Sequence, residues 1–187
     1  MQEPEILQVI QKQREYLDYI ERHYRNVQRA WQIVQERCKD MPLIADDASF
    51  HALDDAIRRH DFSKLSPEEF EPYRRQFYPT PHEDGGLNRP FKAAWEHHQK
   101  HNAHHWQNWT RATYAPPRGW IDPCLHMIID WMAMAYELGG TARTYFEENK
   151  EKIPIPWYAM DFMNEIFDRV YGKENLDGTE GPDKTTE

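Results

Sequence analysis

The sequence has little cysteine, no long apolar run and no excess of positive charge. Among its 187 residues there are only two cysteines, Cys38 and Cys124, which lie far apart and form no CxxC pair. A chain of this length can bury about 70% of its unfolded surface, so it does not need disulfides to stay folded. We therefore expect two reduced thiols in a cytoplasmic protein.

The other two absences concern membranes and nucleic acids. No stretch approaches the ~20 consecutive apolar residues of a membrane span, and residues 1–17 lack the apolar segment of a secretory signal peptide. The formal net charge is -9, whereas binding to nucleic acid usually requires a basic face. We therefore expect neither membrane insertion nor stable binding to nucleic acid.

Histidine and tryptophan, in contrast, are abundant. There are seven tryptophans and ten histidines, and five of the histidines fall within nine residues: His97, His98, His101, His104 and His105. Histidine is the commonest metal ligand and the usual carrier of protons at neutral pH. The histidines are therefore the first place to look for a function.

Apolar residues that recur at three- and four-residue steps predict an all-α fold of six or seven helices. Ser66 and Glu69 form the pattern of a helix start, with Ser66 as the cap and Glu69 completing a capping box. We expect one domain over residues 1–172 and a disordered acidic tail over 173–187. The other predicted helices cover residues 3–38, 46–60, 91–108, 122–138, 141–150 and 157–171.

A His60-Asp61 pair ends the predicted second helix. An adjacent histidine and aspartate can give one neutral nitrogen and one anionic oxygen to the same cation, a mixture that suits Mn, Fe, Mg, Co, Ni or Zn. His23 lies on the inward side of the first helix. Asp130 lies within an apolar run, where a carboxylate must be paired or bound to metal. The alternative for Asp130 is a buried salt bridge, for example to Arg143.

The order His23, His60-Asp61, Asp130 on separate helices resembles that of the HD-domain superfamily of metal-dependent phosphohydrolases. The resemblance covers roughly residues 15–135. It implies an HD-domain-like helical bundle in which these four residues hold a divalent metal. It also implies that Lys64 contacts the substrate phosphate or the attacking water; the alternative is a solvated lysine.

Three segments carry a narrower resemblance, to an uncharacterised family of bacterial and phage proteins. It implies a location in the cytoplasm of a bacterium or of a phage-infected cell, and brings no activity. The chain departs from that pattern at Trp106, where we expect a proline. The segments are His60-Asp61-Phe62-Ser63-Lys64, then Ala94, His98, Asn102 and His104-His105, then Ile128-Ile129-Asp130-Trp131 with Ala133.

On a continuous helix over residues 91–108, His98 and His105 project from the same face, two turns apart. His97 and His104 form a second stripe, offset by about 100°. We therefore expect His98 and His105 to be metal ligands or catalytic groups and His97 to be dispensable. Their axial separation of about 10.5 Å is too large for one ion unless the helix breaks near residues 102–105. His126, one turn before Asp130, is a reserve candidate.

A few arginine and lysine side chains outside the motif are candidates to bind phosphate. Arg74, Arg75, Lys92 and Arg118 could bind phosphate, with surface solvation as the alternative for each. Trp106 and Trp120, which flank loops near the histidines, could stack on a base or sugar.

Three functions remain open at this point. The first is a metal-dependent phosphohydrolase acting on a nucleotide or other small phosphate ester, with Lys64, His98 and His105 as catalytic groups. The second is an HD-type di-iron oxygenase, which would use four histidines and two aspartates. The third is a non-catalytic interaction module with a structural metal. One or two divalent ions and a small phosphate substrate are the expected ligands, and a homodimer stays open.

Overall fold

The computed structural model describes residues 4–83, 89–110 and 119–173, and the structural statements below concern these residues. Within them the chain forms nine α-helices, one short 3-10 helix and no strand, so the all-α prediction is confirmed. Seven of the α-helices have eight residues or more, in agreement with the expected six or seven. From residue 174 the predicted tail lies outside the described residues, and the single-domain organisation stays a prediction.

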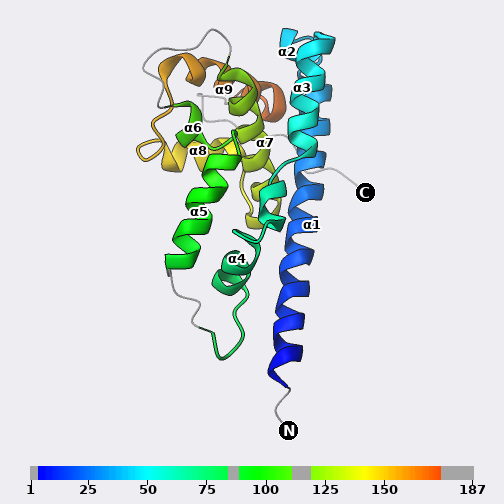
Figure 1. Ribbon diagram of the computed structural model, residues 1–187. Helices are drawn as coiled ribbons and strands as arrows, with labels where there is room; N and C mark the ends of the chain where they lie inside the picture. The colour runs from blue at the N-terminus through cyan, green and yellow to red at the C-terminus, as the bar shows by residue number, and fades with distance from the viewer. Residues whose placement is uncertain (1–3, 84–88, 111–118, 174–187) are drawn as a thin grey trace.

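The core forms where the two longest helices pack together. Helix α1 (Glu5–Arg37) runs along one edge of the molecule (Figure 1), and helix α7 (Ile121–Leu138) packs against its C-terminal half. Helix α7 is buried along most of its length and also contacts α3, α6, α8 and α9. Each fully buried aliphatic side chain stabilises the fold by about 1.5–3 kcal/mol, so an apolar helix such as α7 becomes the centre of the bundle.

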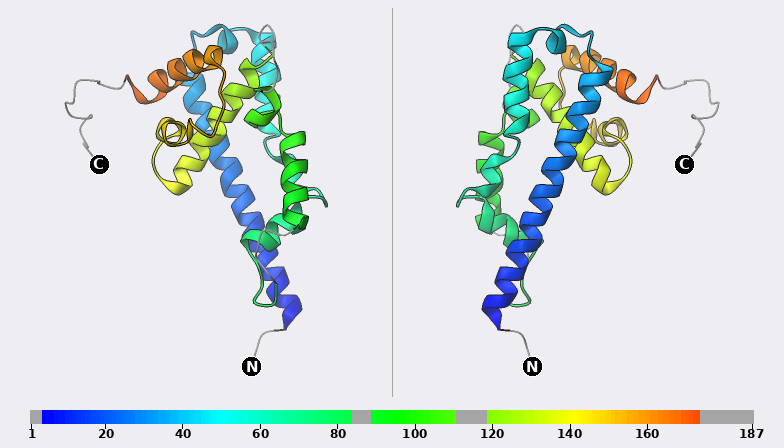
Figure 2. Two further views of the ribbon diagram at one scale, coloured as in Figure 1. Left: turned by 90° about the vertical axis from the view of Figure 1, so that its left-hand side faces the viewer. Right: turned by 90° about the vertical axis from the view of Figure 1, so that its right-hand side faces the viewer.

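The remaining helices lie on two sides of α1. Figure 2 shows α4 (Phe70–Phe77) and α5 (Arg89–His101) on one side, and α8 (Ala142–Asn149) and α9 (Trp157–Tyr171) on the other. No helix in the described part of the chain is long and apolar enough to cross a membrane.

Two helices precede the His60-Asp61 pair in the chain. Helix α2 (Pro42–Ala45), which the sequence pattern does not predict, precedes α3 (Asp47–Arg58). Asp46 caps α3 by accepting a hydrogen bond of 3.0 Å from the backbone N–H of Ser49. Helix α3 ends two residues earlier than predicted, so His60 and Asp61 both lie in the turn that follows it rather than at the end of a helix.

Asp61 adopts a left-handed backbone conformation, with φ at 54°. It is the one non-glycine residue with positive φ among the described residues. Aspartate tolerates this conformation better than most residues, but it still carries a cost, and such strain concentrates at functional sites. The 3-10 helix η1 (Phe62–Leu65) follows directly and brings Lys64 back beside Asp61.

The predicted capping box at Ser66 and Glu69 is wrong. Helix α4 begins at Phe70, and its first turn has no side-chain cap. The Glu69 side chain is fully buried and instead binds the rings of His97 and His98. Two histidine N–H donors inside the protein give this carboxylate a better set of partners than one backbone N–H at the surface.

The predicted helix over residues 91–108 is also wrong, because it is broken. Helix α5 ends at His101, and a short helix α6 (Trp106–Trp109) follows after four residues. The Asn102 side chain donates to the carbonyl of His98 at 2.8 Å, and the Asn108 side chain donates to the carbonyl of Asn102 at 2.9 Å. The backbone N–H groups of Asn102 and His105 also donate to these two carbonyls, so the side-chain amides add hydrogen bonds that stabilise the turn where the helix ends.

Arg74 is completely buried and pairs with Glu71 and Glu83, so it does not bind phosphate. This pairing and the hydrogen bond from the Thr80 backbone N–H lower the pKa of Glu83 to about 2. A lowered pKa gives stability that is present above the ordinary value of 4.5 and is lost as the pH falls toward 2. We expect Glu83→Gln to reduce the free energy of unfolding by about 2–3 kcal/mol at pH 7.

Urea unfolding of both proteins from pH 7 to pH 3 measures this difference. The gap between wild type and Glu83→Gln should narrow as the pH falls below 4.5. A gap that stays constant over this range would show that the Glu83 charge does not contribute to stability.

Candidate metal centre

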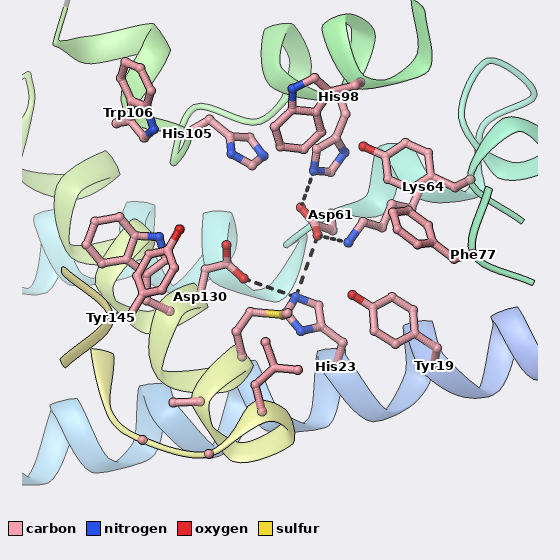
Figure 3. Close-up of a pocket in the computed structure, with 18 of the residues that line it drawn as sticks. Tyr19, His23, Asp61, Lys64, Phe77, His98, His105, Trp106, Asp130 and Tyr145 are labelled. Carbon is pink, nitrogen blue, oxygen red and sulfur yellow. Dashed lines mark ion pairs between the residues drawn. The ribbon is translucent and has the colours of Figure 1, made fainter. Parts of the chain in front are cut away.

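Four side chains from three parts of the fold converge on one point. His23 comes from α1, His60 and Asp61 come from the turn after α3, and Asp130 comes from α7; we call these four residues the first cluster. Figure 3 shows how three of them, His23, Asp61 and Asp130, point toward one another. His23 Nε2 lies 3.0 Å from His60 Nε2 and 3.2 Å from Asp130 Oδ1. His60 Nε2 lies 3.3 Å from Asp61 Oδ2 and 3.6 Å from Asp130 Oδ1.

These distances fit a shared cation. Ligand atoms bound to one ion at about 2.0–2.2 Å lie about 3.0–3.6 Å from one another. Two imidazole lone pairs pointing at each other across 3.0 Å repel unless a proton or a metal ion lies between them. The residues present therefore fit the divalent metal that the sequence predicts at His23, His60, Asp61 and Asp130.

A second group of donors lies on the other side of the two aspartates. Asp61 Oδ1 is 3.3 Å from His98 Nε2 and 3.5 Å from His104 Nε2, and a ring nitrogen of His105 lies within 4.8 Å of both Asp61 and His104. We call Asp61, His98, His104 and His105 the second cluster. Three of its atoms are buried without a hydrogen-bond partner in the described residues: Asp61 Oδ1, His104 Nε2 and His105 Nε2.

Asp61 and Asp130 divide their oxygens between the two clusters. Asp61 presents Oδ2 to the first cluster and Oδ1 to the second, while Asp130 presents Oδ1 to His23 and His60 and Oδ2 to His104 at 3.9 Å. A carboxylate with one oxygen toward each of two donor sets is suited to bridge two cations. Orphaned buried polar atoms cost free energy, and a second ion would satisfy all three in the second cluster.

The charge states of the two aspartates, His104 and His105 suit metal binding. Burial raises the pKa of the Asp61 and Asp130 carboxyls, but the neighbouring histidines, together with Lys64 at Asp61, outweigh it and hold both pKa values well below the usual range. Burial and the nearby His60 lower the pKa of His104, and burial and His98 lower that of His105 to about 4. Near pH 7 the carboxyls are therefore anionic and both imidazoles neutral, which is the form that binds metal.

Lys64 is buried rather than solvated. Its Nζ lies 2.7 Å from Asp61 Oδ2 and 5.6 Å from the centre of the Tyr19 ring. Burial lowers the pKa of Lys64, but the Asp61 carboxylate outweighs this and raises it above its ordinary value. The lysine is therefore charged, and it partly balances the negative charge of the two aspartates.

Glu69 orients one ligand of the second cluster. His98 Nδ1–H donates to Glu69 Oε2 at 2.7 Å, so the lone pair of His98 lies on Nε2, the atom that faces Asp61. A carboxylate behind a metal-binding histidine fixes its tautomer and increases its basicity. The sequence does not reveal this role, because the spacing of Ser66 and Glu69 also fits a capping box.

We expect Glu69→Gln to weaken the second ion about 10–100-fold and to leave the first ion in place. Titration of metal-free protein with Mn²⁺ or Co²⁺ measures both affinities. Glu68→Gln, at the exposed neighbouring position, is the matched control and should bind like wild type. An equal loss of affinity for the second ion in both variants would show that surface charge, rather than the contact between Glu69 and His98, causes the weakening.

The structure separates the five clustered histidines differently from the helical-wheel prediction. His98 and His105 lie in the second cluster, as the sequence predicts, but so does His104, which the prediction places on an offset stripe. His97 binds Glu69 and stacks on the exposed His101, away from the aspartates. The break after His101 causes the difference, and Asn102 and Asn108 are its only local signal in the sequence.

The structure also places three other residues that the sequence singles out. Asp130 does not pair with Arg143, which binds Asp168 instead. Trp120 packs against Tyr158 and Phe162 and contributes to the core rather than to the site. His126 is buried with its Nε2 3.0 Å from His60 Nδ1, and it forms a further possible donor triad with His60 and His104.

A cavity of about 1160 Å³ opens onto both clusters (Figure 3). It is lined by His23, Asp61, Lys64 and Asp130 next to the first cluster and by His98 and His105 next to the second cluster. A small molecule in the cavity can therefore reach both candidate ions.

The fold and site define an all-α protein with a buried His/Asp centre that could hold metal ions. The chain belongs to the family of unknown function DUF5662, whose model matches residues 12–169. No curated protein and no solved structure is significantly similar to it. The family assigns no activity, so the site itself is the guide to function.

Proposed function

We propose that the chain is an HD-type metal-dependent phosphohydrolase that acts on a nucleotide or other small phosphate ester. The observation that carries this proposal is the division of the Asp61 and Asp130 oxygens between two histidine clusters beside a cavity. Bound there, divalent ions would lower the pKa of a water molecule and polarise a phosphoryl oxygen.

The chain's own residues supply the remaining roles. Lys64 lies at the cavity wall beside Asp61 and would neutralise charge on the substrate phosphate. His98 is held by Glu69 and acts as a ligand. His105 faces the cavity with an unpartnered Nε2, so it would either bind the second ion or move a proton to the leaving oxygen.

The test uses protein purified without a histidine tag and stripped of metal. We expect phosphate release to return on addition of Mn²⁺, Co²⁺ or Mg²⁺ in a screen of nucleotides and simpler phosphate esters. Failure to hydrolyse any ester with any of these ions, in protein that binds two equivalents of metal, would refute the proposal.

An HD-type di-iron oxygenase is the second candidate. Two features favour it: the donor set includes at least four histidines together with Asp61 and Asp130, and Lys64 is the one cation among the cavity-lining residues that the structure describes. Iron retained on purification together with oxygen consumption, and no release of phosphate, would select this function. A non-catalytic interaction module would instead hold its metal in a closed ligand set, and the open cavity argues against it.

The proposal implies a small-molecule partner rather than a membrane or a nucleic acid. We also propose, from the family resemblance, that the protein is located in the cytoplasm of a bacterium or of a phage-infected cell. A homodimer is compatible with it, and light scattering would measure this.

A further inference from the structure

The cavity beside the two clusters has aromatic walls. Its lining includes, besides the donors, the aromatic side chains of Tyr73, Phe77, Trp95, Trp106, Trp131 and Tyr145. In Figure 3, Trp106 and Tyr145 lie on one side of the aspartates and Phe77 lies on the other. A ligand that reaches the donors is therefore flanked by flat apolar surfaces.

Several of these apolar side chains face water although they line a cavity. Phe77 is 58% exposed and Leu138 is 78% exposed. Trp95 is partly exposed and packs its ring against His98 and His105, so it lies directly beside the second cluster. Covering these surfaces with an apolar group would remove them from water, which favours binding.

Charge in the cavity is scarce. Apart from the donors, the charged residues in the described lining are Lys64 and Glu148. Lys64 is already paired with Asp61, and Glu148 repels anions. A chain of two or three phosphates usually requires several lysine or arginine side chains, and the described wall does not provide them.

The volume argues for a large ligand. Pockets for drug-sized molecules usually measure about 300–1,000 Å³, and this cavity, at about 1160 Å³, is slightly larger. A simple phosphate ester of a small alcohol would occupy only the part next to the donors and leave the aromatic walls uncovered.

We propose that the ligand of this cavity is an organic molecule with a single phosphoryl group and a large flat or otherwise apolar group. The phosphoryl group lies at the two clusters and the apolar group lies between the aromatic walls. This inference rests on the proposed function for the position of the phosphoryl group, and it narrows the substrate to a monoester with an aromatic or apolar alcohol.

The test compares two phosphonates, which cannot be hydrolysed, by calorimetry on Mn²⁺-loaded protein. We expect naphthylmethylphosphonate to bind at least ~100-fold more tightly than methylphosphonate, because only the first covers the aromatic walls. It should also bind more tightly than ATP or ADP. Equal affinity for the two phosphonates, or tighter binding of ATP, would overturn the inference.

Two tryptophan variants test whether the aromatic walls cause the tighter binding of naphthylmethylphosphonate. Trp95→Ala should weaken the binding of naphthylmethylphosphonate ~10-fold more than that of methylphosphonate, because it removes one wall and no donor. Trp157→Ala is the matched control, since Trp157 is 77% exposed and does not line the cavity. Equal weakening by both variants would contradict binding between the aromatic walls.

The same reagents test the ligand class and the proposed hydrolase activity independently of each other. Tight binding of naphthylmethylphosphonate without hydrolysis of naphthyl phosphate would support the ligand class and refute the hydrolase. Hydrolysis of glycerol phosphate as efficient as that of naphthyl phosphate, with equal binding of the two phosphonates, would support the hydrolase and refute the ligand class.

Discussion

Asp61→Ala is expected to lose both metal ions. Among the residues that the structure describes, Asp61 is the one carboxylate whose two oxygens lie within 3.5 Å of ring nitrogens in both clusters, so its removal takes an anionic ligand from each. It also leaves Lys64 buried without its 2.7 Å partner, and the added positive charge repels a cation. We expect affinity for each ion to fall at least ~100-fold.

Elemental analysis after gel filtration measures the loss. Alanine is strained at the positive φ of Asp61, so Asp61→Asn is the second variant, because asparagine tolerates this conformation and keeps the shape of the side chain. Asp55→Ala, at an exposed position on the preceding helix, is the matched control. A full equivalent of metal retained by Asp61→Asn would remove Asp61 from the ligand set.

The second large effect distinguishes His104 from His97, which a continuous helix would place on the same face. His104→Ala should release the second ion, retain the first and reduce phosphate release at least ~100-fold, because His104 Nε2 lies 3.5 Å from Asp61 Oδ1 in a buried site. His97→Ala should keep both ions and most of the activity, since His97 binds only the far oxygen of Glu69.

Metal stoichiometry and turnover are measured on the same preparations, with His101→Ala as an exposed histidine control. Loss of the second ion in His97→Ala, together with retention of both ions in His104→Ala, would show that His97 rather than His104 binds the second ion. His98→Ala and His105→Ala should also lose activity, as the sequence predicts for both.

The residues of the first cluster can be found in the sequence because each of them has a local signal. His60 and Asp61 are adjacent, and Asp130 is a carboxylate in an otherwise apolar run that becomes the central helix. His23 falls on the same helical face as Val27 and Trp31, which are buried. The fold brings these four residues within ligand distance of one another.

The second cluster is only partly readable in the sequence because its geometry depends on a helix break. The rotation of 100° per residue applies to a continuous helix, and the chain leaves the helix after His101. Asn102 bonds both the His98 carbonyl and Ser63 Oγ, and the second of these contacts joins residues 39 positions apart. No local pattern contains that contact.

The sequence by itself determined the helical class, because helical periodicity is a local property of a chain, and its resemblance to the HD-domain order implied the four residues of the first cluster. Only the tertiary structure decided that Glu69 holds His98, that His104 joins His98 and His105 at the aspartates, and that aromatic side chains from α4 to α8 line one cavity. These three features depend on contacts between distant segments, whose side chains are selected by burial and by the pairing of polar groups away from water.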